Sequence, residues 1–202
     1  LYTKRVALLK WIGGVRPAWA GSGFLKVDGL VERLIDEMSA ETFEDLEIPL
    51  SVVATDFYSG EPVVFESGEL LPALKASMSI PGIFVPVEHD GRILVDGGIV
   101  NNLPFDQLPD DCDITVAINV APTRERDEGE PPGMVEAIVG MFDIMLDRIS
   151  TVRFDEKPPD IHIRPKLVGI RILEFDKTEA VFEQAKPAIE DLGKQLKDRL
   201  GT

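Results

Sequence analysis

Residues 91–104 read Gly-Arg-Ile-Leu-Val-Asp-Gly-Gly-Ile-Val-Asn-Asn-Leu-Pro. The apolar run that ends at Val95 predicts a strand, and Asp96 follows it directly. α/β proteins gather functional groups at the carboxyl ends of strands, where a carboxylate can orient or deprotonate a nucleophile. Gly97 and Gly98 permit positive φ and remove side-chain bulk, so a backbone or a substrate can approach Asp96 closely. Taken alone, however, Asp-Gly-Gly is more typical of a tight turn than of a site.

Strands and helices alternate on both sides of this stretch. The run Asp113–Val120 is almost entirely apolar, which is typical of a strand buried on both faces of a parallel sheet. The alternation predicts an α/β layered fold. We expect strands at residues 50–54, 63–65, 84–87, 92–95 and 161–163, and helices at residues 27–38, 71–78, 134–150 and 178–200.

Other segments predict turns and loops. Residues 1–12 read as the end of a helix, and residues 42–46 as a short helical turn. The sequence His-Asp-Gly at residues 89–91 is typical of a tight turn. Residues 121–133 hold three prolines, two glycines and six charged residues, which predicts an exposed, mobile loop.

The composition excludes several classes of protein. The 202 residues include 21 Lys and Arg against 36 Asp and Glu, and the net charge of −15 offers no basic footprint for a nucleic acid. A polybasic patch for anionic lipid is not evident either. Hydrophobic residues make up 44% of the chain and charged residues 28%, both close to globular averages, which argues against global disorder.

The remaining composition bears on cofactors and location. Cys112 is the single cysteine, which excludes an intramolecular disulfide, and its acidic neighbours argue against a reactive thiolate. No cluster has metal-ligand spacing and no P-loop occurs, so we expect no metal and no cofactor. No apolar stretch approaches the ~20 residues of a membrane span, and no signal-peptide pattern is present. We therefore expect a cytoplasmic protein, with peripheral contact at a membrane as a further option.

Three more segments accompany residues 91–104. They are Pro-Leu-Ser-Val-Val-Ala-Thr-Asp at 49–56, Gly-Glu-Pro-Val-Val-Phe at 60–65 and Val-Ala-Ile-Asn-Val at 116–120. In this order they resemble the C-terminal part of the catalytic domain of bacterial-type patatin-like phospholipases. The resemblance is strong over about residues 42–121 and looser in the flanks. It implies a three-layer α/β sandwich with a mainly parallel central sheet.

The resemblance also implies a chemistry, that of a serine lipid acyl hydrolase with a Ser–Asp dyad. The substrate class is a lipid or fatty-acyl ester, such as a phospholipid or lysophospholipid, met at a membrane surface. Asp96 is the residue that matches the family's aspartate, and an ordinary Asp pKa of about 4 leaves it ionised at neutral pH. Such a dyad needs no histidine, so we interpret His89 and His162 as structural or surface residues.

Four residues after Asp96 are expected to support it. Gly97 and Gly98 form the turn that carries the aspartate. Asn101 and Asn102 are expected to hydrogen-bond this loop, because asparagine side chains stabilise turns through bonds to the backbone.

The chain departs from the family at the nucleophile, because no serine lies in a G-x-S-x-G elbow. Gly13 and Gly14 superficially resemble a glycine-rich oxyanion loop, but Pro17 follows where the family has glycine. Two explanations compete. In the first, residues 1–202 are a partial acyl-hydrolase domain that lacks its N-terminal oxyanion loop and elbow. The absent initiator Met and the start within a helix favour this explanation. In the second, the chain is a natural inactive module that binds lipid or a protein partner. On either explanation, these 202 residues alone are expected to be inactive.

Overall fold

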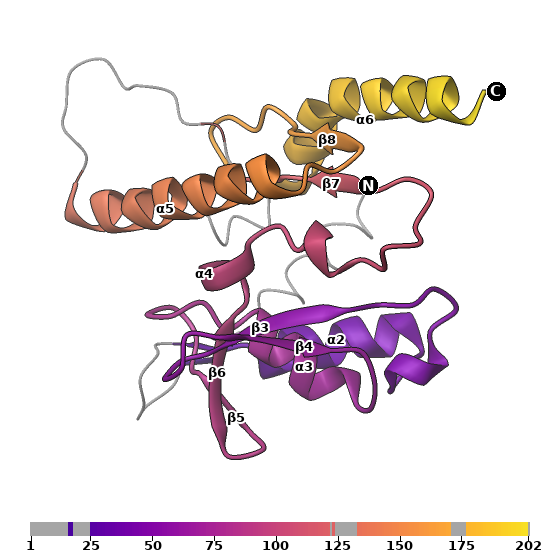
Figure 1. Ribbon diagram of the computed structural model, residues 1–202. Helices are drawn as coiled ribbons and strands as arrows, with labels where there is room; N and C mark the ends of the chain where they lie inside the picture. The colour runs from indigo at the N-terminus through magenta and orange to yellow at the C-terminus, as the bar shows by residue number, and fades with distance from the viewer. Residues whose placement is uncertain (1–15, 18–24, 122, 124–132, 171–176, 202) are drawn as a thin grey trace. The chain divides into compact units, whose positions relative to one another are not determined.

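The computed structural model describes residues 16–17, 25–121, 123, 133–170 and 177–201 (Figure 1). The chain divides into two compact units, residues 1–102 and residues 103–202. The helix end predicted at residues 1–12 and most of the loop predicted at 121–133 lie outside the described residues. Within the described ranges, no helix combines the length and the apolar character needed to cross a membrane.

A four-stranded sheet forms the centre of the first unit. Its order is β4-β3-β6-β5, and each neighbouring pair runs antiparallel. A separate antiparallel pair is formed by β1 (Arg16–Pro17) and β2 (Leu25–Lys26). The α/β class is confirmed, but the prediction of a mainly parallel central sheet is wrong for these strands. The strands of the larger sheet are β3 (Val52–Asp56), β4 (Pro62–Phe65), β5 (Val87–His89) and β6 (Arg92–Asp96).

Short connections explain why two of the three strand pairs, β3–β4 and β5–β6, are antiparallel. Residues 57–61 join β3 to β4, and Asp90 and Gly91 join β5 to β6. A parallel pair needs a crossover of a dozen residues or more, which connections this short do not allow. Asp90 (φ 48°) and Gly91 (φ 72°) both adopt the left-handed conformation that type I′ hairpin turns require. The turn predicted at residues 89–91 is confirmed.

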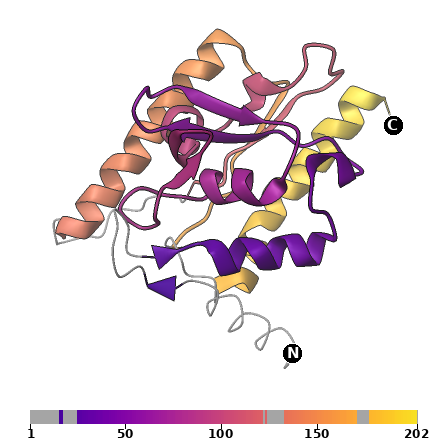
Figure 2. The same ribbon diagram turned by 90° about the horizontal axis from the view of Figure 1, so that it is seen from below.

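Two helices pack in the first unit, α2 (Asp28–Met38) and α3 (Leu70–Ser77). α3 contacts β3 and β6, and α2 lies beside α3 (Figure 2). The helices predicted at 27–38 and 71–78 are confirmed to within a residue, as is the helical turn near Phe43–Asp45. Two buried clusters join α3 to the sheet; one contains Phe43, Val52, Leu70 and Ala73, and the other contains Ala54, Ala76 and Leu94.

The segment between α3 and β6 differs from its prediction. A strand was expected at residues 84–87, but β5 begins only at Val87. The N–H groups of Ile83 and Phe84 instead donate to the Ile80 carbonyl oxygen, at 3.1 and 2.8 Å. Pro86 has no N–H to donate to a ladder, which limits pairing at this point.

The second unit contains two long helices and a parallel pair of strands. They are α5 (Met134–Glu156), α6 (Thr178–Leu200), β7 (Val116–Ile118) and β8 (Ile161–Ile163). The parallel strand predicted within Asp113–Val120 is therefore confirmed at β7. The prediction that the whole run is buried on both faces is wrong, because Ile118 is 47% exposed and Val120 64% exposed. In the described part of the chain β8 is the one strand beside β7, so this pair lacks the flanking strands of a larger parallel sheet.

Aromatic packing holds α5 to its surroundings in the second unit. The ring of Phe154 lies 5.3 Å from that of Phe105 and 4.4 Å from that of His162, measured between centroids. Beside this stack, Arg153 Nη1 donates to Asp106 Oδ2 at 2.6 Å. Partial desolvation lowers the pKa of His162 and the nearby Arg164 lowers it further, whereas Asp147 opposes the decrease. These contacts are what the structural interpretation of His162 predicts.

Candidate functional site

The site is built around Asp96, the last residue of β6. The Asp96 N–H donates to the Ser79 carbonyl oxygen at 3.0 Å, and the Asp96 carbonyl accepts from the Thr55 hydroxyl at 2.9 Å. Ser79 and Thr55 are both buried, and the sheet places Asp96 opposite Ala54. Two segments distant in sequence therefore fix the backbone that carries the carboxylate.

The turn after β6 anchors the carboxylate itself. Asp96 Oδ1 accepts the Gly98 N–H at 2.7 Å, and α4 (Gly98–Asn101) begins at this bond. The Asn101 N–H continues the helix by donating to the Gly97 carbonyl oxygen at 2.9 Å. Among the described residues none donates a hydrogen bond to the second carboxylate oxygen, Oδ2.

Gly97 is required by close packing and not by its backbone angle. Its φ is −67°, which any residue can adopt. A Cβ at this position would lie 2.1 Å from the Val53 carbonyl oxygen and 2.6 Å from the Val53 carbonyl carbon. The sequence suggested two reasons for this glycine, a positive φ and the close approach of another backbone. The structure shows the close approach.

Gly98 leaves room for the carboxylate. A Cβ here would lie 2.9 Å from Asp96 Oδ1 and 3.1 Å from Asn102 Oδ1. Both neighbours are side-chain atoms. The absence of a Cβ at Gly98 therefore leaves space for the Asp96 carboxylate, whereas at Gly97 it leaves space for another backbone. The side chain of Asn102 lies next to this position, and Asn101 is buried in α4. Their expected side-chain hydrogen bonds to the loop stay a prediction.

The electrostatic setting of Asp96 differs from that of a surface aspartate. Burial raises the pKa of Asp96, because the carboxylate loses solvation, and the hydrogen bond from Gly98 opposes the increase. The pKa expected from sequence, that of an unperturbed aspartate, is therefore too low. A raised pKa makes the carboxylate a stronger base, provided that it is ionised at the working pH.

Comparison with known proteins places this site in a family. The sequence pattern described as patatin-like phospholipase matches residues 4–109 of the chain, which include Asp96 and the turn after it. The chain belongs to the patatin-like phospholipase family. The match overlaps the region of strongest resemblance, residues 42–121, but it also extends through the N-terminal flank and ends before the segment at 116–120.

Relatives in this family come from bacteria and animals. The chain is 32% identical to an uncharacterized NTE family protein of Mycobacterium tuberculosis over 142 residues, which are 65% of this chain and 39% of that protein. It is 29% identical to patatin-like phospholipase domain-containing protein 7 of Rattus norvegicus over 194 residues, 79% of this chain and 14% of that protein. The chain thus spans about two fifths of the length of the mycobacterial protein and less of the rat protein.

Three of the described serines donate their hydroxyl hydrogen bonds to groups other than Asp96. The Ser79 hydroxyl donates to the Lys75 carbonyl oxygen at 2.7 Å, and Ser150 donates to Leu146 at 3.0 Å in the same manner. Ser51 donates to Glu66 Oε1 at 2.8 Å. In the part of the chain that the structure describes, no serine hydroxyl bonds to the Asp96 carboxylate, so the structure brings together the aspartate and its turn but not a nucleophile.

Sequence reasoning missed two residues of the site, Thr55 and Ser79. Both hold the backbone of Asp96, from β3 and from the end of α3. In the sequence, Ser79 is one of the serines that lie outside any G-x-S-x-G elbow, and Thr55 is part of the segment 49–56 that resembles the family. The available signal was a hydroxyl in an otherwise apolar, buried run, which needs a hydrogen-bond partner when it is buried.

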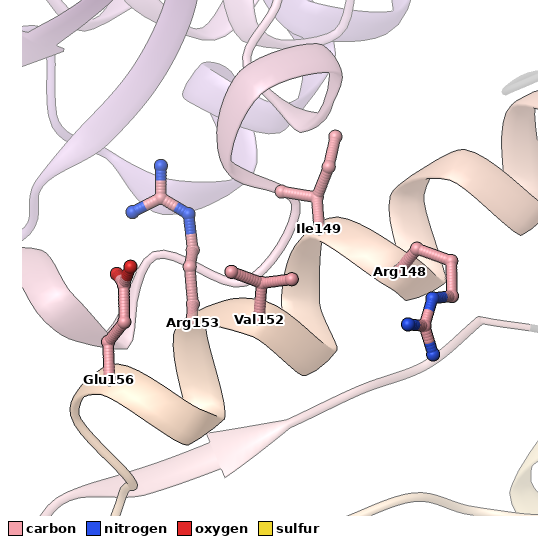
Figure 3. A pocket seen from close by; sticks show the side chains of 5 residues that line it. All are labelled: Arg148, Ile149, Val152, Arg153 and Glu156. Atoms are coloured by element: carbon pink, nitrogen blue, oxygen red, sulfur yellow. The ribbon is translucent and has the colours of Figure 1, made fainter.

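A concave surface lies on α5 and contains none of these residues. Arg148, Ile149, Val152, Arg153 and Glu156 line a hollow of about 430 Å³ (Figure 3). Figure 3 shows the guanidinium groups of Arg148 and Arg153 pointing to opposite sides, so they do not converge on one ligand. Arg153 is in addition engaged by Asp106. Within the described residues, no group of three or more His, Cys, Asp or Glu side chains is placed to hold a metal ion.

Proposed function

We propose that the protein containing this chain is a serine lipid acyl hydrolase in which Asp96 is the base of a Ser–Asp dyad. The observation that supports this most directly is the Asp96 carboxylate. It is partly buried, anchored through Oδ1 by Gly98, and leaves Oδ2 for a hydroxyl donor. Its occurrence within the family match adds support.

The proposed reaction proceeds in two halves. In the first, a serine hydroxyl attacks the carbonyl carbon of a fatty-acyl ester while Asp96 accepts the hydroxyl proton, and the proton then passes to the departing alcohol oxygen. In the second, Asp96 accepts a proton from water, whose oxygen attacks the acyl-enzyme. The fatty acid leaves and the proton returns to the serine. No histidine takes part.

The nucleophile lies outside the 202 residues in this proposal. The chain is a partial patatin-like domain, and the oxyanion loop and G-x-S-x-G elbow belong to an N-terminal portion of the same protein. The substrate is a phospholipid, a lysophospholipid or another fatty-acyl ester. The protein acts in the cytoplasm at membrane surfaces, and the net charge of −15 on these 202 residues argues against nucleic acid as a partner.

A second candidate function is an inactive family module that binds lipid or a protein partner. It is favoured by the absence of an elbow from the sequence. A fluorophosphonate probe separates the two, because it labels an activated serine covalently. The hydrolase proposal expects stoichiometric labelling of the protein at its natural length, and absence of labelling supports the inactive module.

Asp96→Asn tests the role of the aspartate. The amide keeps an oxygen for the Gly98 N–H but cannot accept a proton at neutral pH, so kcat on a short-chain p-nitrophenyl ester is expected to fall by about 10²–10⁴-fold. KM changes little, because the carboxylate acts on the nucleophile. Asp90→Asn is the matched control, since Asp90 is an exposed residue of the β5–β6 turn. Activity of Asp96→Asn within a few-fold of wild type would exclude the dyad.

A further inference from the structure

We propose that Phe57 and Tyr58, at the tip of the β3–β4 hairpin, insert into a zwitterionic lipid surface and hold the first unit against it. This inference rests on the proposed function, because a lipid acyl hydrolase meets its substrate at such a surface. It adds which residues make the contact and which kind of lipid they select.

The tip is held in one backbone conformation. The Asp56 N–H donates to the Glu61 carbonyl oxygen at 3.0 Å, and the Gly60 N–H donates to the Asp56 carbonyl oxygen at 2.9 Å. Asp56 Oδ1 accepts the Tyr58 N–H at 3.0 Å, and Gly60 adopts the positive φ of 72° that closes the turn. These bonds make Asp56 part of the turn, and they leave little backbone freedom to be lost on binding.

The side chains at this fixed tip point to solvent. Phe57 is 56% exposed and Tyr58 is 82% exposed. Their rings are 5.4 Å apart and nearly perpendicular, at 86°. Single exposed apolar residues are common, but a pre-arranged aromatic pair offers apolar area that gains free energy when it leaves water. A tyrosine beside a phenylalanine suits the boundary between headgroups and acyl chains, because its hydroxyl stays hydrated while its ring is buried.

Charges at the same end of the sheet indicate the kind of lipid. The Phe57 N–H donates to Ile93 at 2.8 Å, which places the tip beside Arg92 and the β5–β6 turn. Arg92, Asp90 and Glu61 are all exposed there. Positive and negative side chains therefore both surround the aromatic pair. A zwitterionic headgroup offers a partner for each, because its phosphate is negative and its ammonium is positive.

The net charge decides against two other occupants. The net charge of −15 on these 202 residues disfavours contact with an anionic membrane and with a second copy of the chain. A neutral surface that carries internal dipoles meets no such repulsion. A zwitterionic bilayer is therefore the occupant that fits the apolar pair and its charged surroundings together.

The tip is also close to the candidate site. Asp96 pairs with Ala54, and Phe57 lies three residues further along the chain. At about 3.3 Å per residue, the two backbones are roughly 10 Å apart along the strand. An anchored tip therefore holds Asp96 within roughly 10 Å of the residues that contact the lipid.

Sedimentation with sucrose-loaded phosphatidylcholine vesicles tests the inference on the protein at its natural length. The double variant Phe57→Ser/Tyr58→Ser is expected to lower the partition coefficient by at least about tenfold, because two rings no longer leave water. Phe182→Ser is the matched control, since Phe182 is an exposed phenylalanine on α6, and its partition should equal that of wild type. The measurement needs no turnover, so it can fail while hydrolysis is observed, or succeed with an inactive protein.

Tyr58→Trp supplies a second measurement that does not depend on loss of binding. Its additional fluorescence, taken relative to wild type, should shift to the blue on phosphatidylcholine vesicles and be quenched by brominated acyl chains. Equal sedimentation of the double variant and wild type overturns the inference, as does sedimentation only with anionic lipid. Self-association that the double variant abolishes, without vesicle binding, assigns the tip to a second copy and also overturns it.

Discussion

Gly97→Ala is the substitution for which the structure predicts the largest effect in the candidate site. A Cβ at residue 97 would lie 2.1 Å from the Val53 carbonyl oxygen, whereas real Cβ atoms essentially never come closer than 3.0 Å, so the shortfall is at least 3.0 − 2.1 = 0.9 Å. The obstacle is backbone in the middle of β3, not the end of a flexible side chain. Relief requires α4 and β3 to separate, which strains the pairing of Ala54 with Asp96.

The expected cost follows from this geometry. Overpacking a core by one methyl group typically costs 1–3 kcal/mol, and a clash between two backbones belongs at the upper end, at about 3 kcal/mol. For a protein of this size, a loss of about 3 kcal/mol lowers Tm by roughly 6–12 °C. Because the displaced segment carries Asp96, hydrolytic activity should be lost together with stability.

Differential scanning calorimetry measures this effect, and Gly193→Ala provides the matched control. Gly193 lies inside α6, and a Cβ there meets nothing within 4 Å. Alanine is a better helix former than glycine by about 1 kcal/mol, so this variant should melt about 2–4 °C higher than wild type. A Gly97→Ala protein with Tm within 2 °C of wild type and unchanged activity would refute the close approach of residue 97 to Val53.

Two further predictions concern the same turn. In Gly98→Ala the new Cβ lies 2.9 Å from Asp96 Oδ1, a side-chain atom that can move, so Tm should stay within about 2 °C of wild type. The displaced carboxylate should lower kcat about tenfold or more. An unchanged kcat would show that the position of the carboxylate is not critical. The raised pKa of Asp96 should also make the free energy of unfolding depend on pH. The unfolded chain loses this proton near its ordinary pKa of 3.8 and the native state only at higher pH, so the stabilising contribution is complete below 3.8 and disappears as pH rises through the native pKa. The difference in unfolding free energy between wild type and Asp96→Asn, from urea titrations across this range, should therefore decrease with rising pH; an increase would contradict a raised pKa.

Local features of the site and of several elements could be predicted from the sequence. The Asp-Gly pair at residues 90–91 predicts a hairpin turn, because both positions need positive φ, and the structure has it. The apolar spacing in residues 27–38 predicts a helix, because one face of that helix has to leave water. Asp96 followed by two glycines predicts a carboxylate on a tight turn. Each of these depends on neighbours within a few residues, which a sequence displays directly.

Long-range pairing decided the rest. The family resemblance implied a mainly parallel sheet, but strand direction depends on which strands pair. Hairpin connections make the β3–β4 and β5–β6 pairs antiparallel, and β3 also pairs antiparallel with the distant β6. Thr55 bonds to the carbonyl of a residue 41 positions away, a contact that no local pattern reveals.

The sequence by itself determined which residue is the candidate base and that it stands at the end of a strand. Only the tertiary structure decided why Gly97 has to be glycine and in which direction the pKa of Asp96 moves. The physical reason is that steric clash and desolvation both depend on atoms brought close by folding. The Val53 carbonyl that excludes a Cβ, and the burial that raises the pKa, exist only once β3 and β6 have paired.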